Sequence, residues 1–149
     1  MNGVLYRLYN ITKDLRHLVL AQIFVKPCFL GLLAVKANSL SNLDINTHIP
    51  IVIGRQMRYE VTRHPLYKEI ATFFIDMVNS SHTYATGGTS INELWYDPKR
   101  LAGALTYETE GSCTTYNMLK IVHLFHAIYS NGPKRLRTRT TTRERSTAC

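Results

Sequence analysis

Apolar residues recur every three or four positions through most of the first 80 residues and again after residue 114, which is the spacing of one face of a helix. Asp14 is suited to cap a helix that continues to Pro27, and Pro65 is suited to open one. Pro50 would fit the first turn of another helix, which begins near residue 49. The pattern predicts helices over residues 4–11, 15–26, 49–61, 65–78 and 114–129, with a further apolar run over 29–35.

A weak internal repeat runs through this pattern at an offset of 50 residues. Residues 9–13 (Tyr-Asn-Ile-Thr-Lys) match residues 59–63 (Tyr-Glu-Val-Thr-Arg), and an Ala and a Phe follow in step after each. Each copy predicts two helices joined by a short turn. Repeats of this kind form stacked helical hairpins, because a single hairpin cannot bury its apolar face alone.

The predicted fold class is therefore all-α, as part of an (α/α)6-barrel, with a long loop rich in Gly and Thr. We expect a partial barrel domain over residues 1–130, cut off within a hairpin, and a disordered basic tail over 131–149. Apolar stripes left exposed on the helices over 66–78 and 116–125 would let copies of the chain self-associate.

Charge is concentrated in the tail. The chain has a net charge of +8, and residues 131–149 hold six Lys or Arg against Glu144. This segment has no aromatic residue for stacking on bases, so we do not expect a nucleic-acid partner. A solvated tail and out-of-frame sequence are the preferred interpretations. A helical binding module whose tail contacts an anionic partner is the alternative function, and deleting 131–149 would abolish its salt-dependent binding.

Other function classes find little support. Three cysteines without a CxxC spacing predict no disulfide framework, and no signal peptide follows Met1. The most apolar window, residues 17–35, is interrupted by Gln22, Lys26 and Pro27, so a membrane span is not expected. The segment from His82 to Lys120 is too long for a simple turn and too aromatic for disorder, which is typical of a functional loop.

Four short motifs carry a family resemblance: Asn-Thr-His-Ile-Pro around His48, Tyr-Ala-Thr-Gly-Gly from Tyr84, Glu93, and Cys-Thr-Thr-Tyr-Asn-Met-Leu-Lys from Cys113. Over residues 1–126 the chain resembles glycoside hydrolase family 127, the β-L-arabinofuranosidases, and most closely the plant members. The resemblance implies an (α/α)6-barrel followed by β-sandwich domains, of which this chain would be a slice. It also implies glycan substrates that contain L-arabinofuranose, and retaining hydrolysis by a zinc-bound cysteine thiolate with a Glu acid/base.

The resemblance assigns roles to only some residues of this chain. Glu93 matches the acid/base, and Cys113 matches the first of three cysteine ligands of zinc. Gly111 stands where the family has its glutamate ligand, and Glu110, one residue earlier, is a doubtful substitute. The nucleophile and last ligand form a Cys-Cys pair in the family, whereas Cys149 stands alone here. We therefore expect zinc in full-length relatives, none bound to this chain, and no activity.

Glu93 and Cys113 each have a plainer interpretation. A general acid works best with a raised pKa, and Leu94 and Trp95 would give Glu93 apolar surroundings. The alternative is a loop Glu that faces solvent. Cys113 is either a vestigial zinc ligand or a small buried residue at a helix start.

Three further residues are candidates for substrate binding. His48 precedes Pro50 at a predicted helix start, where it would contact sugar, cap the helix or pack. His82 and Tyr84 would line the cleft or simply pack the loop. Trp95 is equally suited to the core and to a sugar platform.

Overall fold

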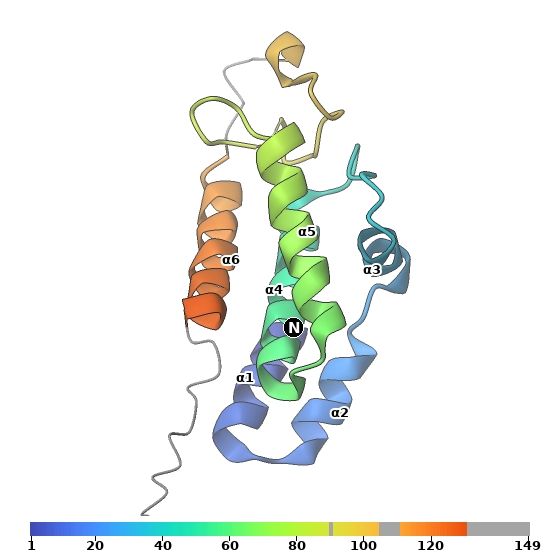
Figure 1. Cartoon of the computed structure of the whole chain (residues 1–149), viewed down its shortest axis with the longest axis vertical. Coiled ribbons are helices and arrows are strands. Elements are labelled where there is room, and N and C mark those ends of the chain that lie inside the picture. The colour runs from blue at the N-terminus through green and yellow to red at the C-terminus, as the bar shows by residue number, and fades with distance from the viewer. Residues whose placement is uncertain (90, 105–110, 131–149) are drawn as a thin grey trace, which may run out of the picture.

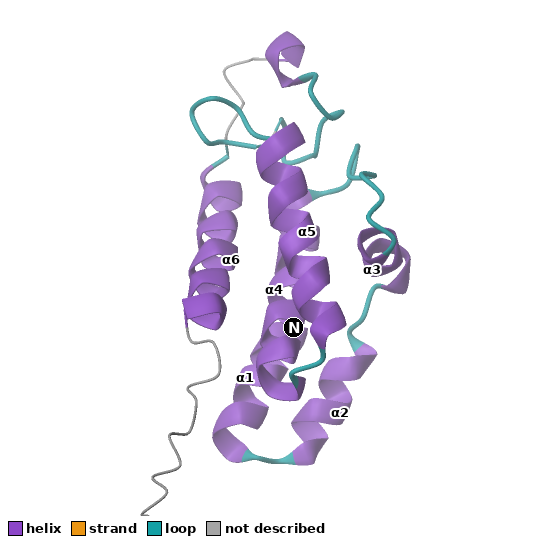
Figure 2. Ribbon diagram, in the orientation of Figure 1, coloured by secondary structure: helices purple, strands orange, loops and turns teal. Residues whose placement is uncertain are grey.

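The computed structural model describes residues 1–89, 91–104 and 111–130. These residues form helices joined by loops, and two isolated β-bridges lie in the loops and at their ends. No β-strand forms within them, so the all-α fold class is confirmed (Figure 2). The predicted tail, 131–149, lies outside the described residues. The elements are α1 (Asn2–Thr12), α2 (Leu15–Ile23), α3 (Pro27–Ala34), α4 (Ile45–Thr62), α5 (Pro65–Ser81), a short 3-10 helix (Leu101–Ala104) and α6 (Ser112–Ser130).

Helix α4 is the axis of the structure. It packs against α1, α5 and α6, while α3 packs on α5. Helices α1, α4 and α6 run in one direction, and α2 and α5 return in the other (Figure 1). Two side-chain hydrogen bonds tie α6 to α4: Asn117 Nδ2 donates to Asn46 Oδ1 at 3.3 Å, and Gln56 Nε2 donates to the Ile121 carbonyl at 3.0 Å. This is the arrangement of neighbouring hairpins in an α/α barrel.

The two turns of the internal repeat are built alike. Lys13 and Arg63 are left-handed at φ 59° and 57°, and each N–H donates to the carbonyl four residues earlier, at 2.8 and 2.7 Å. The Thr12 and Thr62 hydroxyls each donate to the carbonyl four residues earlier, at 2.9 and 2.8 Å. Each basic side chain also lies over the Tyr ring four residues before it, at 5.9 and 5.8 Å. The predicted pair of helical hairpins is confirmed.

The start of α4 was predicted four residues too late. Asp44 caps the helix by accepting a hydrogen bond from the Thr47 N–H at 2.6 Å, so α4 begins at Ile45. Pro50 consequently lies inside the helix and not in its first turn. The second helix was predicted too long: it ends at Ile23, and Pro27 starts α3, because the residue before a proline disfavours helical backbone. The caps at Asp14 and the opening by Pro65 are confirmed.

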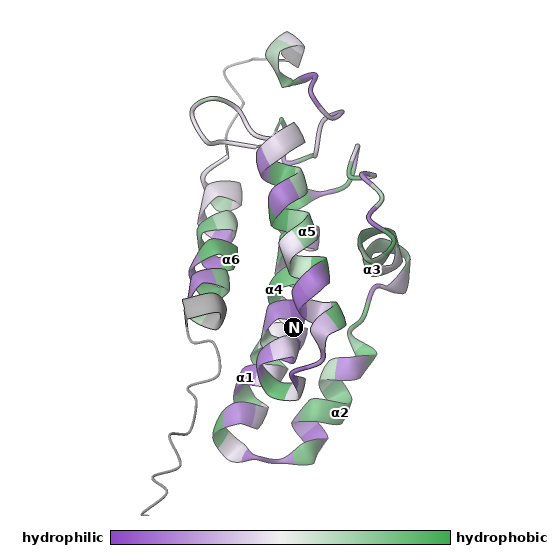
Figure 3. Ribbon diagram, viewed as in Figure 1, coloured by the Kyte–Doolittle hydropathy of each residue, from purple (hydrophilic) through white to green (hydrophobic). Residues whose placement is uncertain are grey.

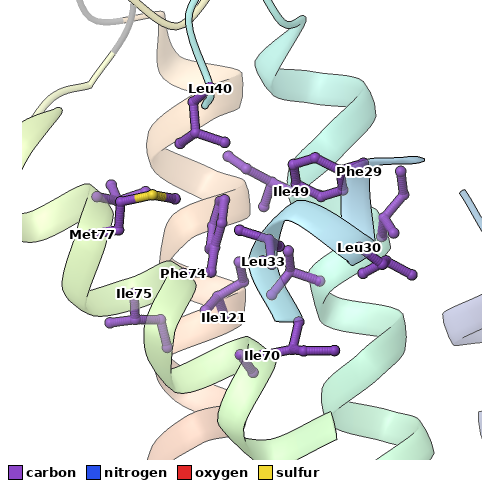
Figure 4. Packing of buried hydrophobic residues seen from close by; sticks show 14 of the residues in the cluster. Phe29, Leu30, Leu33, Leu40, Ile49, Ile70, Phe74, Ile75, Met77 and Ile121 are labelled. Carbon is purple, nitrogen blue, oxygen red and sulfur yellow. The ribbon is translucent and has the colours of Figure 1, made fainter. Parts of the chain in front are cut away.

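One main core joins α3, α4, α5 and α6 (Figure 4), and the loop residue Trp95 belongs to the same cluster. Residues at helical spacing on α5 supply much of it, as the pattern predicted. Phe74 meets Phe29 of α3 edge to face at 6.4 Å. The fully or nearly buried residues of this core include Phe29, Leu33, Leu40, Ile45, Ile49, Val52, Phe74, Val78, Trp95 and Ile121.

Exposed apolar side chains lie only partly on the helices where they were expected. The face of α5 is buried, with only Leu66 at its start 39% exposed, so the prediction of an exposed stripe there was wrong. The prediction holds for α6, where hydrophobic and hydrophilic bands alternate and Tyr116, Leu119 and Val122 are exposed (Figure 3). Further exposed residues on α1 and α2 are Val4, Ile11, Leu15, Val19 and Ile23. Self-association stays a prediction.

No single helix of the described residues is long and apolar enough to cross a membrane. Helices α2 and α3 satisfy that length and composition only when they are taken together, and the pair is bent by 86°.

Close contact between α1 and α4 predicts opposite effects for two helical glycines. A Cβ on Gly54 would lie within 2.6 Å of three atoms of the buried Asn2 amide, whereas a Cβ on Gly31 meets nothing within 4 Å. Ala is favoured over Gly inside a helix by about 1 kcal/mol. We expect Gly31→Ala to raise the free energy of unfolding by up to about that amount and Gly54→Ala to lower it, measured by urea denaturation. A Gly54→Ala variant as stable as Gly31→Ala would contradict this packing.

Candidate functional site

The candidate residues gather at one end of the helices, where α4 and α6 begin and α5 ends (Figure 1). Residues 91–95 return there and pair with residues 42–45, just before and at the start of α4. The Asn42 N–H donates to the Trp95 carbonyl at 2.9 Å, and the Trp95 N–H donates to the Leu43 carbonyl at 3.0 Å. We call these two segments, 42–45 and 91–95, the clamp.

Glu93 sits at the tip of a two-residue turn within the clamp. Ile91 and Leu94 exchange both backbone hydrogen bonds, at 3.2 and 2.9 Å, and the central residues Asn92 and Glu93 have φ of 48° and 64°. Positive φ at both central positions is the type I′ pattern, which favours Asn followed by Gly. Glu93 therefore occupies a position that disfavours a side chain, at a cost of about 1–2 kcal/mol.

The surroundings of Glu93 differ from those expected. Glu93 is exposed and Leu94 is 40% exposed, while Trp95 turns away into the core, so the predicted apolar surroundings are absent. The Glu93 carbonyl accepts a hydrogen bond from the Ile45 N–H at 2.9 Å, which fixes the turn above the first turn of α4. The carboxylate is thus held at the surface, with its backbone anchored.

His48 lies one turn into α4, on the same end of the helix. Its Nδ1 is 2.6 Å from the Asp44 carbonyl, so Nδ1–H donates and Nε2 is left as an acceptor. The ring packs edge to face against Phe29 at 4.6 Å and is half-buried. This geometry satisfies the packing interpretation and leaves one ring nitrogen for a ligand.

Cys113 lies in the first turn of α6 and is exposed with a free thiol, so the interpretation as a small buried residue was wrong. Asn117, one turn later, is bonded to Asn46 in the first turn of α4, which places Cys113 at the same end as His48 and Glu93. Glu110 lies outside the described residues.

The residues present do not fit a complete zinc site. Within the part of the chain that the structure describes, no group of three His, Cys, Asp or Glu side chains is close enough to hold a metal ion. A structural zinc site needs four ligands, and Cys113 is the one described residue of the implied set.

His82 packs the loop. It is fully buried, with Nδ1 3.0 Å from the Tyr96 carbonyl and Nε2 2.8 Å from the side-chain oxygen of Asn38. Its ring meets Trp95 edge to face at 5.7 Å, and Trp95 meets Phe74 at 5.9 Å. Burial lowers the pKa of His82. Trp95 is only 1% exposed, so of its two interpretations the core is correct and the sugar platform is wrong.

Tyr84 closes a tight turn before the clamp. Its N–H donates to the Gly88 carbonyl at 2.8 Å, and its carbonyl accepts from the Gly87 N–H at 2.9 Å. Gly87 has φ 96°, which explains the glycine there. The Tyr84 side chain is buried at 9% exposure, so its geometry favours packing over lining a cleft.

A groove of about 670 Å³ opens between α1, α4 and α6, but none of the candidate residues lines it. Its walls come close to the candidate site only through Pro50 and Asn117, and it extends along α4 to Glu60. The groove and the candidate end of the helices are therefore separate features.

The family model of the beta-L-arabinofuranosidase GH127 catalytic domain matches residues 1–134. The chain belongs to this family. The match spans all described residues and supports arabinofuranose-containing glycans as the substrate class of the family. No curated protein matches the chain.

Sequence reasoning missed the residues that hold the candidate site together. The Asn46–Asn117 bond and the Asn38 contact to His82 join positions 71 and 44 residues apart, and no local pattern marks them. The turn at Asn92 and Glu93 was missed because Glu stands where a type I′ turn favours Gly.

Burial of His82 predicts that stability depends on pH. Its folded pKa lies below the value of about 6.5 for a free His, so between these values only the unfolded chain takes up the proton. The free energy of unfolding should therefore fall as pH drops through about 6.5 and level off below the folded pKa. His82→Gln, which is neutral at every pH, should flatten this slope in urea titrations.

The matched control is His64→Asn, which replaces an exposed histidine and keeps a helix-capping side chain. It should leave the slope unchanged. If the slope persists in His82→Gln and disappears in His64→Asn, then His64 and not His82 causes the pH dependence, and the prediction is wrong.

Proposed function

We propose that the chain forms the acid/base side of a retaining β-L-arabinofuranosidase active site, at the N-terminal end of α4. The family membership supports the reaction class. The single observation that carries the site is the placement of Glu93. Its carbonyl is anchored to the Ile45 N–H at the start of α4, its backbone is left-handed, and its side chain faces solvent with no packing gain.

In this proposal Glu93 protonates the glycosidic oxygen as the bond to the leaving group breaks, and later accepts a proton from the attacking water. Its exposure lets the carboxyl reach a bound glycan. His48 donates from Nδ1–H to the Asp44 carbonyl, so its Nε2 is free to accept a hydrogen bond from a sugar hydroxyl. His82 and Tyr84 act by holding the loop and do not contact substrate.

We further propose that these 149 residues do not turn over substrate alone. The resemblance implies a thiolate nucleophile from a Cys-Cys pair, and Cys28, Cys113 and Cys149 form no such pair. Cys113 matches a ligand position, and with Glu110 as a doubtful second it would leave a zinc ion short of four ligands. General acid catalysis alone contributes about 10²–10⁴-fold, below the roughly 10⁶-fold or more of enzymes.

The test is a titration of the ¹⁵N-labelled chain with methyl β-L-arabinofuranoside, with zinc present. Backbone resonances of residues 45–48 and 91–94 should shift saturably, resonances of α2 should not, and no free arabinose should accumulate. His48→Phe keeps the ring against Phe29 but removes Nε2, so it should weaken binding several-fold. The α-anomer is the matched control ligand.

Two results would contradict the proposal in different ways. Shifts confined to the groove residues Arg7 and His123 would place the sugar elsewhere. Arabinose release that is lost in both Glu93→Gln and Cys113→Ala, but not in Glu60→Gln, would show that the chain is a complete catalyst.

A further inference from the structure

Arg55 of α4 is a buried cation without a counterion. It is 1% exposed, and its guanidinium lies 5.8 Å from the ring of Tyr67 and close to the hydroxyl of the fully buried Tyr6. Among the described residues it forms no ion pair. Burying an ionised group is costly unless a charge and hydrogen bonds compensate it. Burial accordingly lowers the pKa of Arg55.

The unused atoms of Arg55 form one edge of the guanidinium. Nε and Nη2 are buried and have no hydrogen-bond partner. Their N–H bonds point the same way, which is the fork that binds both oxygens of a carboxylate. Arg16 of this protein uses the same edge: its Nε donates to Asp14 Oδ1 at 3.1 Å and its Nη2 donates to Asp14 Oδ2 at 2.6 Å, which lowers the pKa of that carboxyl to about 2.

Two neighbours of Arg55 bring further donors near it. Arg58, one turn along α4, has a buried Nε without a partner, and its guanidinium lies 4.4 Å from the Tyr67 ring. The Tyr6 hydroxyl is also buried without a partner. Arg58 and Tyr67 are only half-buried, so the cluster opens toward solvent on their side. Donors and positive charge thus lie together where the described residues supply no carboxylate.

We propose that Arg55, with Arg58 and Tyr6, binds a small monovalent carboxylate ion. A planar ion with two oxygens matches the Nε–Nη2 edge, whereas chloride offers one acceptor centre. A divalent phosphate would bring more charge into a buried place and a larger desolvation cost. The site lies on the side of α4 that faces α1 and α5, away from Glu93, and it does not rest on the proposed glycosidase function.

The experiment follows thermal unfolding of the full chain in sodium formate and in sodium chloride at equal ionic strength. Formate binds the folded state only, so it should raise the Tm by several degrees more than chloride does. Arg55→Met should abolish the difference and raise the Tm measured without formate, because it removes the uncompensated charge. Arg55→Lys keeps the charge without the fork and should lose most of the formate effect. Arg63→Met, at an exposed arginine, should keep it.

Equal shifts in formate and chloride for the unmodified chain would overturn the proposal, as would a formate effect that survives in Arg55→Met. If Arg55→Met does not fold, the arginine Nε–H resonances of the ¹⁵N-labelled chain give a second readout. The resonance missing from Arg55→Lys should shift saturably with formate. A resonance that does not move with formate would refute the site.

Discussion

The candidate site depends on the clamp between residues 91–95 and 42–45. Its three long-range backbone hydrogen bonds are each worth about 1 kcal/mol net, and burial of Trp95 against Phe74 and His82 adds the larger hydrophobic contribution. Among the described residues of the loop that follows α5, the one helical segment is the short 3-10 helix over Leu101–Ala104. The clamp therefore sets where Glu93 stands relative to α4.

Helix α4 also determines where the other candidate residues lie. Because α1 and α6 run parallel to α4, the starts of α4 and α6 face the same loops, and the Asn46–Asn117 bond fixes them side by side. His48 and Cys113 therefore reach the end of the bundle that also carries Glu93. The opposite end holds the two repeated turns, whose left-handed residues reverse the chain. The candidate site and the two repeated turns thus lie at opposite ends of the helices.

Local features were predictable from the sequence, and long-range ones were not. Helical periodicity, the caps at Asp14 and Pro65, and the offset-50 repeat gave the helices and hairpins, because each depends on residues within a few positions. The start of α4 was missed because Pro50 was taken as a first-turn proline, although Asp44 caps the helix. The burial of Trp95, the exposure of Cys113 and the contacts of His82 depend on packing between separate parts of the chain, as in the Asn38–His82 contact across 44 residues, for which the sequence carries no local signal.

We propose that Glu93 is kept on an unfavourable turn for its chemistry and not for its contribution to folding. The most direct test is the free energy of unfolding of Glu93→Gly, measured by urea denaturation beside Asn92→Gly. Glycine relieves the left-handed strain, so Glu93→Gly should stabilise the chain by about 1 kcal/mol, and Asn92→Gly should change it less, since Asn tolerates this conformation. A Glu93→Gly variant less stable than the unmodified chain would show that the side chain holds the fold, and would contradict the account.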